Sequence, residues 1–327
     1  MHPSTISRRS LLALGLSAAA HATPAATYPA QPVKLVAPTP PAGLIDIVGR
    51  LFAEKLAPAL GQPVTVDNRP GAAGNIGAAF VAKSPPDGHT LLVGFDGTLV
   101  INPWIYPSTG FDTLKDFSPI LKLADAGLLL VANPQVPARS LQDLIAGQKA
   151  GRSAPLAYAT SGVGSTPHIC GELLAQRTGL KLQHIPYKGG GQAIADVIAG
   201  QVPLCMTVLA TATPHIRSGK LVPLGIATER RLPGMPDLPT FQEAGLPGFV
   251  MNSWVGMLAP ARTPQPVIER LHKEFFLALA RNDTRERFQQ LGLEPVGNSP
   301  QEFASQIRSD LDRYRKVIKA ARITVDG

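Results

Sequence analysis

The sequence predicts an α/β protein of two lobes, each with a parallel or mixed sheet flanked by helices, joined at a hinge around a central cleft. Three observations support this. The chain has 327 residues, more than one ordinary domain needs. Short apolar runs alternate with helical patterns, and the alternation restarts after Asn133-Pro134. A late strand and two late helices pack most economically on the first unit. We therefore expect residues 27–131 with 252–327 in lobe 1, and 132–251 in lobe 2.

Lobe 1 opens with three β-type runs separated by Gly- and Pro-rich loops and helical segments. The runs cover residues 33–37, 64–66 and 89–94, and the helices cover 46–60 and 75–83. A further strand is predicted at 128–132. After lobe 2, a strand at 254–258 and helices at about 264–281 and from 300 onward complete the lobe.

Lobe 2 repeats the same alternation. We expect strands at 155–159, 181–185, 203–208 and 221–227, and helices at 140–150, 166–177, 192–199 and 211–218. Strands that alternate with helices in this way are typical of parallel sheets.

The first 26 residues have the pattern of an export signal. Arg8-Arg9 precede an apolar run of about ten residues, too short to span a membrane, and Ala20-His21-Ala22 offers a small-x-small cleavage site. The arginine pair leaves both the twin-arginine and the general secretory route open. We expect a mature protein in the periplasm, where Cys170 and Cys205 could pair, although free buried cysteines are the more common case.

Composition excludes several classes. Lys and Arg total 31 against 23 Asp and Glu, but the basic residues are scattered and aromatic residues make up only 6%, so we expect no nucleic-acid partner. The seven His form no H-x-x-x-H pair and the chain has two Cys, so we expect no metal site. The chain has neither a dinucleotide fingerprint nor a P-loop, and we expect no cofactor.

The informative residues lie in loops that follow strands, where ligands bind in open α/β sheets. Thr160, Ser161, Gly164 and Ser165 lead into a predicted helix that carries His168. Unpaired N–H groups at a helix start, with the positive end of the helix dipole, suit an anion. A plain N-cap is the alternative reading.

Two other loops are candidates. Tyr187 and Lys188 precede three glycines, which can form a nest of N–H donors beside a positive charge. Asp96 and Thr98 follow another strand, where Asp96 could instead serve as a turn residue. Enzyme motifs are weak, because Ser165 and His168 lack an orienting acid and the serine is not placed as in G-x-S-x-G.

The ordered motifs resemble one known family, the Bug-type receptors of tripartite tricarboxylate transporters. The resemblance covers about residues 28–325. It rests on Tyr28-Pro29, Pro38-Thr39-Pro40-Pro41-Ala42-Gly43, Asn68-Arg69-Pro70-Gly71-Ala72-Ala73-Gly74-Asn75, Pro85-Pro86-Asp87-Gly88, Gly162-x-Gly164-Ser165-x-x-His168 and His184-Ile185-Pro186-Tyr187-Lys188-Gly189.

This resemblance implies a type II-like periplasmic binding protein whose lobes close on a small carboxylate. By position it implicates the following residues in ligand binding: Thr39, Gly43, Gly74, Asn75, Thr98, Thr160, Ser161, Gly164, Ser165 and His168. The family often has an Asp where this chain has Thr207, and commonly a Gly pair where it has Ala42-Gly43. Without that carboxylate we expect a ligand whose other end is neutral or anionic, rather than an amino acid.

The leading prediction is therefore a monomeric, non-enzymatic receptor that presents a small organic carboxylate to a membrane permease. A ligand-dependent sensor for a signalling partner is the first alternative. A secreted hydrolase using Ser165 and His168 is the second.

Overall fold

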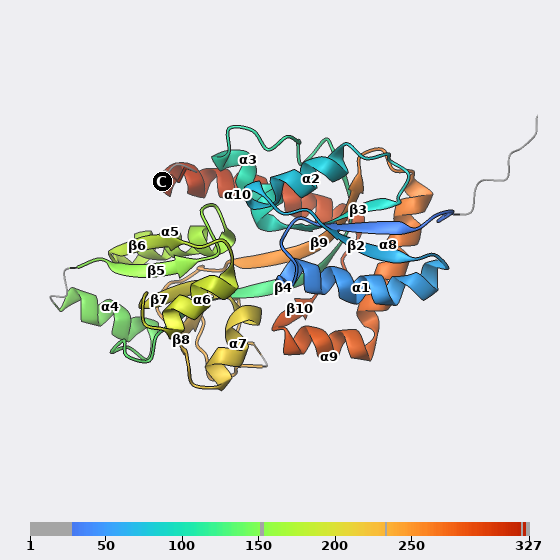
Figure 1. Ribbon diagram of the computed structural model, residues 1–327. Helices are drawn as coiled ribbons and strands as arrows, with labels where there is room; N and C mark the ends of the chain where they lie inside the picture. The colour runs from blue at the N-terminus through green and yellow to red at the C-terminus, as the bar shows by residue number, and fades with distance from the viewer. Residues whose placement is uncertain (1–27, 151–153, 233, 322, 325–327) are drawn as a thin grey trace, which may run out of the picture.

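The computed structural model describes residues 28–150, 154–232, 234–321 and 323–324, so the predicted export signal lies outside the described residues. Figure 1 shows two lobes side by side, with the long strand β4 (Phe117–Ala132) running through both. The α/β class and the two lobes predicted from the sequence are confirmed.

Lobe 1 is a sheet of order β2-β1-β3-β9-β4, with β10 on the other edge of β4. Helices α1, α8 and α9 pack on one face, and α2 and α10 on the other. The strands are β1 (Val33–Ala37), β2 (Val64–Asn68), β3 (Thr90–Phe95), β9 (Asn252–Pro260) and β10 (Leu293–Pro295). The helices are α1 (Leu44–Leu60), α2 (Asn75–Ala82), α3 (Asn102–Ile105), α8 (Gln265–Ala280), α9 (Asn282–Gln290) and α10 (Pro300–Ala321), and a π-type turn spans Gly97–Ile101.

Lobe 2 continues the sheet from β4 through β7 and β5 to β6, while β8 pairs with β4 on its other side. Helices α4 and α5 cover one face, and α6 and α7 cover the other. The elements are α4 (Leu141–Lys149), β5 (Leu156–Thr160), α5 (Thr166–Thr178), β6 (Leu182–Pro186), α6 (Gly190–Ile198), β7 (Leu204–Val208), α7 (Leu209–Arg217) and β8 (Val222–Ile226).

The predicted strand at 128–132 was too short, since β4 begins at Phe117. Pro119, Lys122 and Asp125 interrupt the apolar pattern that marks a buried strand. The structure accommodates all three. Shifts of register lie directly after Pro119 and Lys122, and the Lys122 ammonium pairs with the Asp125 carboxylate at 3.0 Å.

Strand directions bring two groups of loops face to face. β1, β2 and β3 run parallel to one another, and β3 runs in the direction of β4, because both are antiparallel to β9. β5, β6 and β7 run parallel to one another and opposite to β4. The carboxyl ends of the two groups therefore point at each other. Phe95, the last residue of β3, lies level with Ala124 of β4, and Val208, the last residue of β7, lies level with Leu128. The two strand ends are therefore about 14 Å apart along β4.

One apolar core is shared by both lobes. Tyr314 and Ile318 of α10 belong to the same buried cluster as Ile169 and Leu174 of α5. In Figure 1, α10 extends from lobe 1 until its end lies close to α5, with which it is in contact. The lobe boundaries predicted after residues 131 and 251 stay a prediction. The partners of β4 change at Gly127–Leu128.

The two cysteines are free and buried, as the sequence favoured. Cys170 packs in the cluster that both lobes share, whereas Cys205 packs in the cluster beneath α6 and α7. Within the described residues, none of the helices has the length and apolar character needed to span a bilayer.

Candidate functional site

The predicted binding residues gather in the loops where the two groups of strand ends meet. Lobe 1 contributes loops after β1, β2 and β3, and lobe 2 contributes loops after β5, β6 and β7. The ends of these strands, the loops and the adjoining helix starts hold Thr39, Gly43, Gly74, Asn75, Asp96 and Thr98 from lobe 1, and Thr160, Ser161, Gly164, Ser165, His168, Tyr187, Lys188 and Thr207 from lobe 2. A hydrogen bond of 2.6 Å from the Thr166 hydroxyl to the Asp96 carboxylate joins the two sets.

The start of α5 offers fewer open donors than the sequence suggested. The Ser165 hydroxyl accepts from the His168 N–H at 3.3 Å and donates to the Gly162 carbonyl at 2.7 Å. Pro167 has no N–H. In the described part of the chain, the Thr166 N–H is the first-turn donor left without a protein partner. The N-cap reading is thus confirmed, whereas the anion site stays a prediction, for which one open donor remains.

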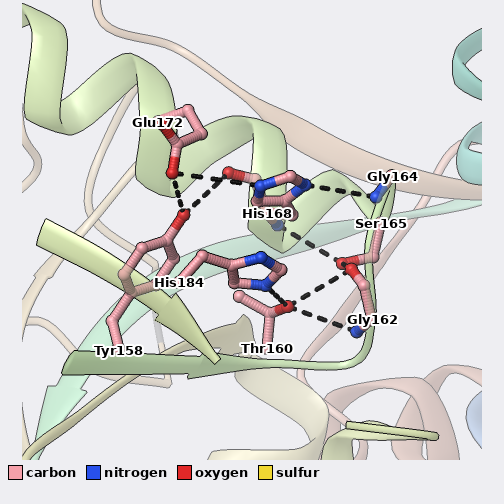
Figure 2. Close-up of polar contacts among 8 residues, drawn as sticks. All are labelled: Tyr158, Thr160, Gly162, Gly164, Ser165, His168, Glu172 and His184. Atoms are coloured by element: carbon pink, nitrogen blue, oxygen red, sulfur yellow. Dashed lines mark hydrogen bonds and ion pairs between the residues drawn. The ribbon is translucent and has the colours of Figure 1, made fainter. Parts of the chain in front are cut away.

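Two stacked histidines lie beside this loop (Figure 2). The rings of His168 and His184 lie 3.8 Å apart and nearly parallel. Nδ1 of His168 accepts from the Gly164 N–H at 3.1 Å, and Nε2 of His184 lies 2.6 Å from the Thr160 hydroxyl. Burial lowers the pKa of His168 to about 4. Burial, with the neighbouring His168, lowers the pKa of His184 to about 3. Both rings are therefore neutral at pH 7.

A tyrosine and a glutamate complete the support. The Tyr158 hydroxyl donates to the Glu172 carboxylate at 2.6 Å, and burial raises the pKa of Tyr158. The Glu172 carboxylate also lies 3.9 Å from Nε2 of His168, which is beyond hydrogen-bond distance. The Thr160 hydroxyl in turn accepts from the Gly162 N–H at 3.2 Å. The network fixes the course of the loop from Thr160 to Ser165.

This geometry does not fit a serine hydrolase. A nucleophilic serine needs a base within hydrogen-bond reach of its hydroxyl. The Ser165 hydroxyl instead bonds to backbone groups, and the ring nitrogen of His168 closer to the loop is occupied by the Gly164 N–H.

The loops of lobe 1 keep polar atoms unpaired. Among the described residues, the Thr39 hydroxyl and the Asn75 side-chain NH₂ are buried without a protein partner. The other end of the Asn75 amide accepts from the Asn102 NH₂ at 2.7 Å. Gly74 adopts φ 92°, and a side chain there would meet the Thr98 hydroxyl. Unpaired buried donors of this kind are the groups that a bound anion or water satisfies.

The start of α6 is also open. Gly189 is its N-cap, and no side chain caps the helix. A Cβ built on Gly190 would lie 3.7 Å from the Thr207 hydroxyl, which in turn lies 2.9 Å from the Thr211 hydroxyl. Lys188 is exposed, while the Tyr187 hydroxyl donates to Asp196 at 2.6 Å. The side chain closest to Gly190 at the start of α6 is thus the Thr207 hydroxyl, and the Asp196 carboxylate accepts from the Tyr187 hydroxyl.

Asp96 is placed differently from the other candidates. It is fully buried, and its two oxygens accept from Thr166 and from Ser253, each at 2.6 Å. Its carboxylate is thus engaged within the protein.

Sequence reasoning counted the Thr166 hydroxyl towards an anion site at the start of α5, but it missed Asn102, His184 and Ser253 as contributors. His184 stands in an alternating strand and Ser253 at the start of another, so neither carries a loop signal. Thr166 and Asn102 each precede a proline at a helix start, a pattern typical of helix initiation.

Two hollows lie away from these loops. One, of about 280 Å³, lies at the far end of lobe 2 beside Val136 and Leu156. The other, of about 210 Å³, lies between α7 and α9 beside Arg217 and Arg285. Within the described residues, no group of three or more His, Cys, Asp or Glu is arranged to hold a metal.

Comparison with known proteins fits this arrangement. Residues 48–323 match the family model described as the tripartite tricarboxylate transporter family receptor. The chain belongs to this receptor family. Protein BugT of Bordetella pertussis is 37% identical over 294 residues, which cover 90% of each chain.

Solved structures of similar proteins contain dicarboxylates. The Rhodopseudomonas palustris protein Rpa4515, determined with adipate, is 34% identical, with a TM-score of 0.85 over 91% of this chain and 99% of its own. MatC of the same organism, with bound malate, is 33% identical, with a TM-score of 0.80 over 89% of this chain and all of its own. The family consists of solute-binding receptors of the periplasm, so the predicted family, function class and fold class are confirmed.

Proposed function

We propose that this receptor captures a small organic carboxylate between its lobes, without chemical change, and presents it to the permease of a tripartite tricarboxylate-type transporter. The observation that carries the proposal is that the carboxyl ends of the lobe 1 and lobe 2 strands point at each other. Helix starts with open N–H groups and small hydroxyls from both lobes therefore face one region. Contacts from both lobes would favour the closed state when ligand binds.

The proposed contacts are those predicted from the sequence, except that Asp96 acts within the protein. They are Thr39, Gly43, Gly74, Asn75, Thr98, Thr160, Ser161, Gly164, Ser165, His168, Tyr187, Lys188 and Thr207. The surroundings of Thr207 support a ligand whose second end is anionic or neutral. Adipate and malate, found in similar proteins, are therefore the first ligands to test.

Isothermal titration calorimetry of the mature protein tests the proposal. We expect binding of at least one dicarboxylate, and tighter binding of succinate than of aspartate, its amino analogue. Ser161→Asp, which adds a negative charge beside the α5 loop, should weaken binding at least tenfold. Ser218→Asp, at the exposed end of α7, should leave it unchanged. Equal effects of the two variants would contradict the proposed site.

Delivery and location need separate tests. We propose export through the N-terminal signal, with a mature chain that starts after Ala22 and is monomeric. Cell fractionation and intact mass measure the first two properties, and sedimentation measures the third. Deletion of the receptor should abolish uptake of the bound carboxylate, and uptake that persists would rule out the transport role.

A further inference from the structure

Asp96 links the two lobes directly beside the proposed site. One carboxylate oxygen accepts from the hydroxyl of Ser253 on β9, within lobe 1. The other accepts from the hydroxyl of Thr166, the first residue of α5 in lobe 2. Asp96 and Thr166 are 0% and 3% exposed, so bulk water does not screen this contact. A charge belonging to lobe 1 therefore holds the helix end of lobe 2 that carries the open Thr166 N–H.

The charges around Asp96 do not neutralise it. Helix α10 supplies Asp310, which accepts from the Trp254 indole at 3.0 Å and from Arg313 at 3.0 Å, and the buried phenol of Tyr314. Strand β4 supplies Asp125, paired with Lys122. On α5, burial raises the pKa of Cys170, which keeps this thiol neutral, and His168 is neutral as well. Among the described residues, no Lys or Arg forms an ion pair with Asp96.

The balance of these effects leaves Asp96 able to titrate near neutrality. Burial raises its pKa to about 6, and the hydroxyls of Ser253 and Thr166 oppose the rise while Asp310 adds to it. Both protonation states are thus accessible at moderate pH. Either state fits the site, because a hydroxyl that donates to the carboxylate can turn and accept from the carboxylic acid.

We propose that Asp96 couples capture of a carboxylate between the lobes to uptake of one proton. The inference rests on the proposed function, since it needs an anion at the start of α5. A second negative charge beside a buried carboxylate favours the neutral acid. The proton comes from solvent and binds one carboxylate oxygen of Asp96, so the pair of negative charges becomes one. By linkage, the proton must strengthen carboxylate binding as much as the carboxylate strengthens proton binding.

Calorimetry with adipate and malate, between pH 5.5 and 7.5 in buffers of different ionisation enthalpy, measures the coupling. We expect the wild-type protein to take up a fraction of a proton per ligand near pH 6.5. Its affinity should rise about tenfold towards acid pH for each unit by which the ligand raises the pKa of Asp96. In Asp96→Asn both effects should fall to what protonation of the ligand itself contributes. Asp143→Asn, at the start of α4 at the far end of lobe 2, should behave like the wild type. Protonation of the ligand itself appears equally in all three proteins.

A ligand-free titration separates failure of this inference from failure of the proposed function. The amide resonances of Gly97 and Thr166, followed by NMR, should shift with a midpoint near pH 6 in the wild type and should not do so in Asp96→Asn. Ser253→Ala removes a donor to the ionised form and should move the midpoint to higher pH. A flat wild-type titration overturns the inference whether or not a ligand binds. Proton uptake in Asp96→Asn that equals that of the wild type overturns it as well. If no carboxylate binds while Asp96 titrates, the proposed function fails, and the coupling fails with it.

Discussion

The two sides of the proposed site are built in opposite ways. In lobe 2 the loop from Thr160 to Ser165 bonds to itself and to the stacked pair of His168 and His184. In lobe 1 the loops keep unpaired buried polar atoms, and three alanines, Ala42, Ala72 and Ala73, adopt positive φ. One side is thus preformed, whereas the other stores strain and unsatisfied donors. At the proposed site, a ligand would therefore bind a preformed surface on lobe 2 and provide partners for the unpaired groups of lobe 1.

The largest loss of stability is expected from a substitution in the lobe 2 loop itself. Gly164→Ala should lower the free energy of unfolding by about 3 kcal/mol. The residue has φ 72°, and its new Cβ would clash with Cδ1 of Ile105. The matched control is Gly189→Ala, where φ is 175° and nothing lies within 4 Å, so its effect should stay within about 0.5 kcal/mol. Urea denaturation measures both, and equal losses would refute the distinction.

The second prediction concerns the pH dependence of stability. The two sides carry buried groups, His168 and Asp96, whose contributions to stability change with pH in opposite directions. The pKa of His168 is lowered to about 4, so the native state favours the neutral ring. Its contribution is fully present above pH 6.5 and is lost as the pH falls towards 4, roughly 3 kcal/mol in all. The pKa of Asp96 is raised to about 6, so its contribution instead declines as the pH rises from about 4 to 6.

Asp96→Asn should therefore steepen the gain of stability between pH 4 and 6, because it removes the opposing slope. His168→Asn should flatten the same curve. Urea denaturation at half-unit steps of pH measures both curves. If the two variants shift the curve in the same direction, the assignment of the two groups is wrong.

Removal of a single hydrogen bond should have a smaller effect. His168→Leu leaves the buried Gly164 N–H without an acceptor, which should destabilise the protein by about 2 kcal/mol. His168→Asn can place its oxygen near the former position of Nδ1 and should recover most of that loss. Amide exchange of Gly164 reports the bond itself. Unchanged exchange in the leucine variant would show that the histidine does not hold the loop.

Some helices and strands of the fold could be predicted from the sequence better than others. Helices with a clear apolar periodicity, such as α1 and α10, lie close to their predicted positions. Helix α9 was missed because eight of its nine residues are polar and only Phe288 is apolar. The first half of β4 was missed because Lys122 and Asp125 read as surface residues. Their mutual pairing, which makes them tolerable in a strand, depends on three-dimensional contact.

The candidate site shows the same limit. Glycines and hydroxyls after strands identified the loops, because that chemistry is local. The stacking of His168 on His184 and the link from Asp96 to Thr166 join residues 16 and 70 positions apart. The spacing of residues along the chain does not predict such contacts. The sequence therefore predicted which loops form the candidate site, but not which contacts support those loops.

The smallest expected change in stability concerns the strained backbone of lobe 1. Ala73 has φ 51° and ψ 35°, a left-handed conformation that costs a residue with a Cβ about 1 kcal/mol or more. Its carbonyl accepts from Thr98 at 2.8 Å and from Asn102 at 3.1 Å, and these bonds hold the backbone in place. Ala73→Gly should remove the steric cost at a smaller entropic one, so stability should rise by about 0.5 kcal/mol.

The control for this change is Ala79→Gly, inside α2, where the same substitution should cost about 1 kcal/mol. If Ala73→Gly destabilises the protein as much as Ala79→Gly does, the loop is not strained. If it stabilises the protein and also weakens carboxylate binding, the strain serves to keep the Thr98 and Asn75 side chains in position for the ligand.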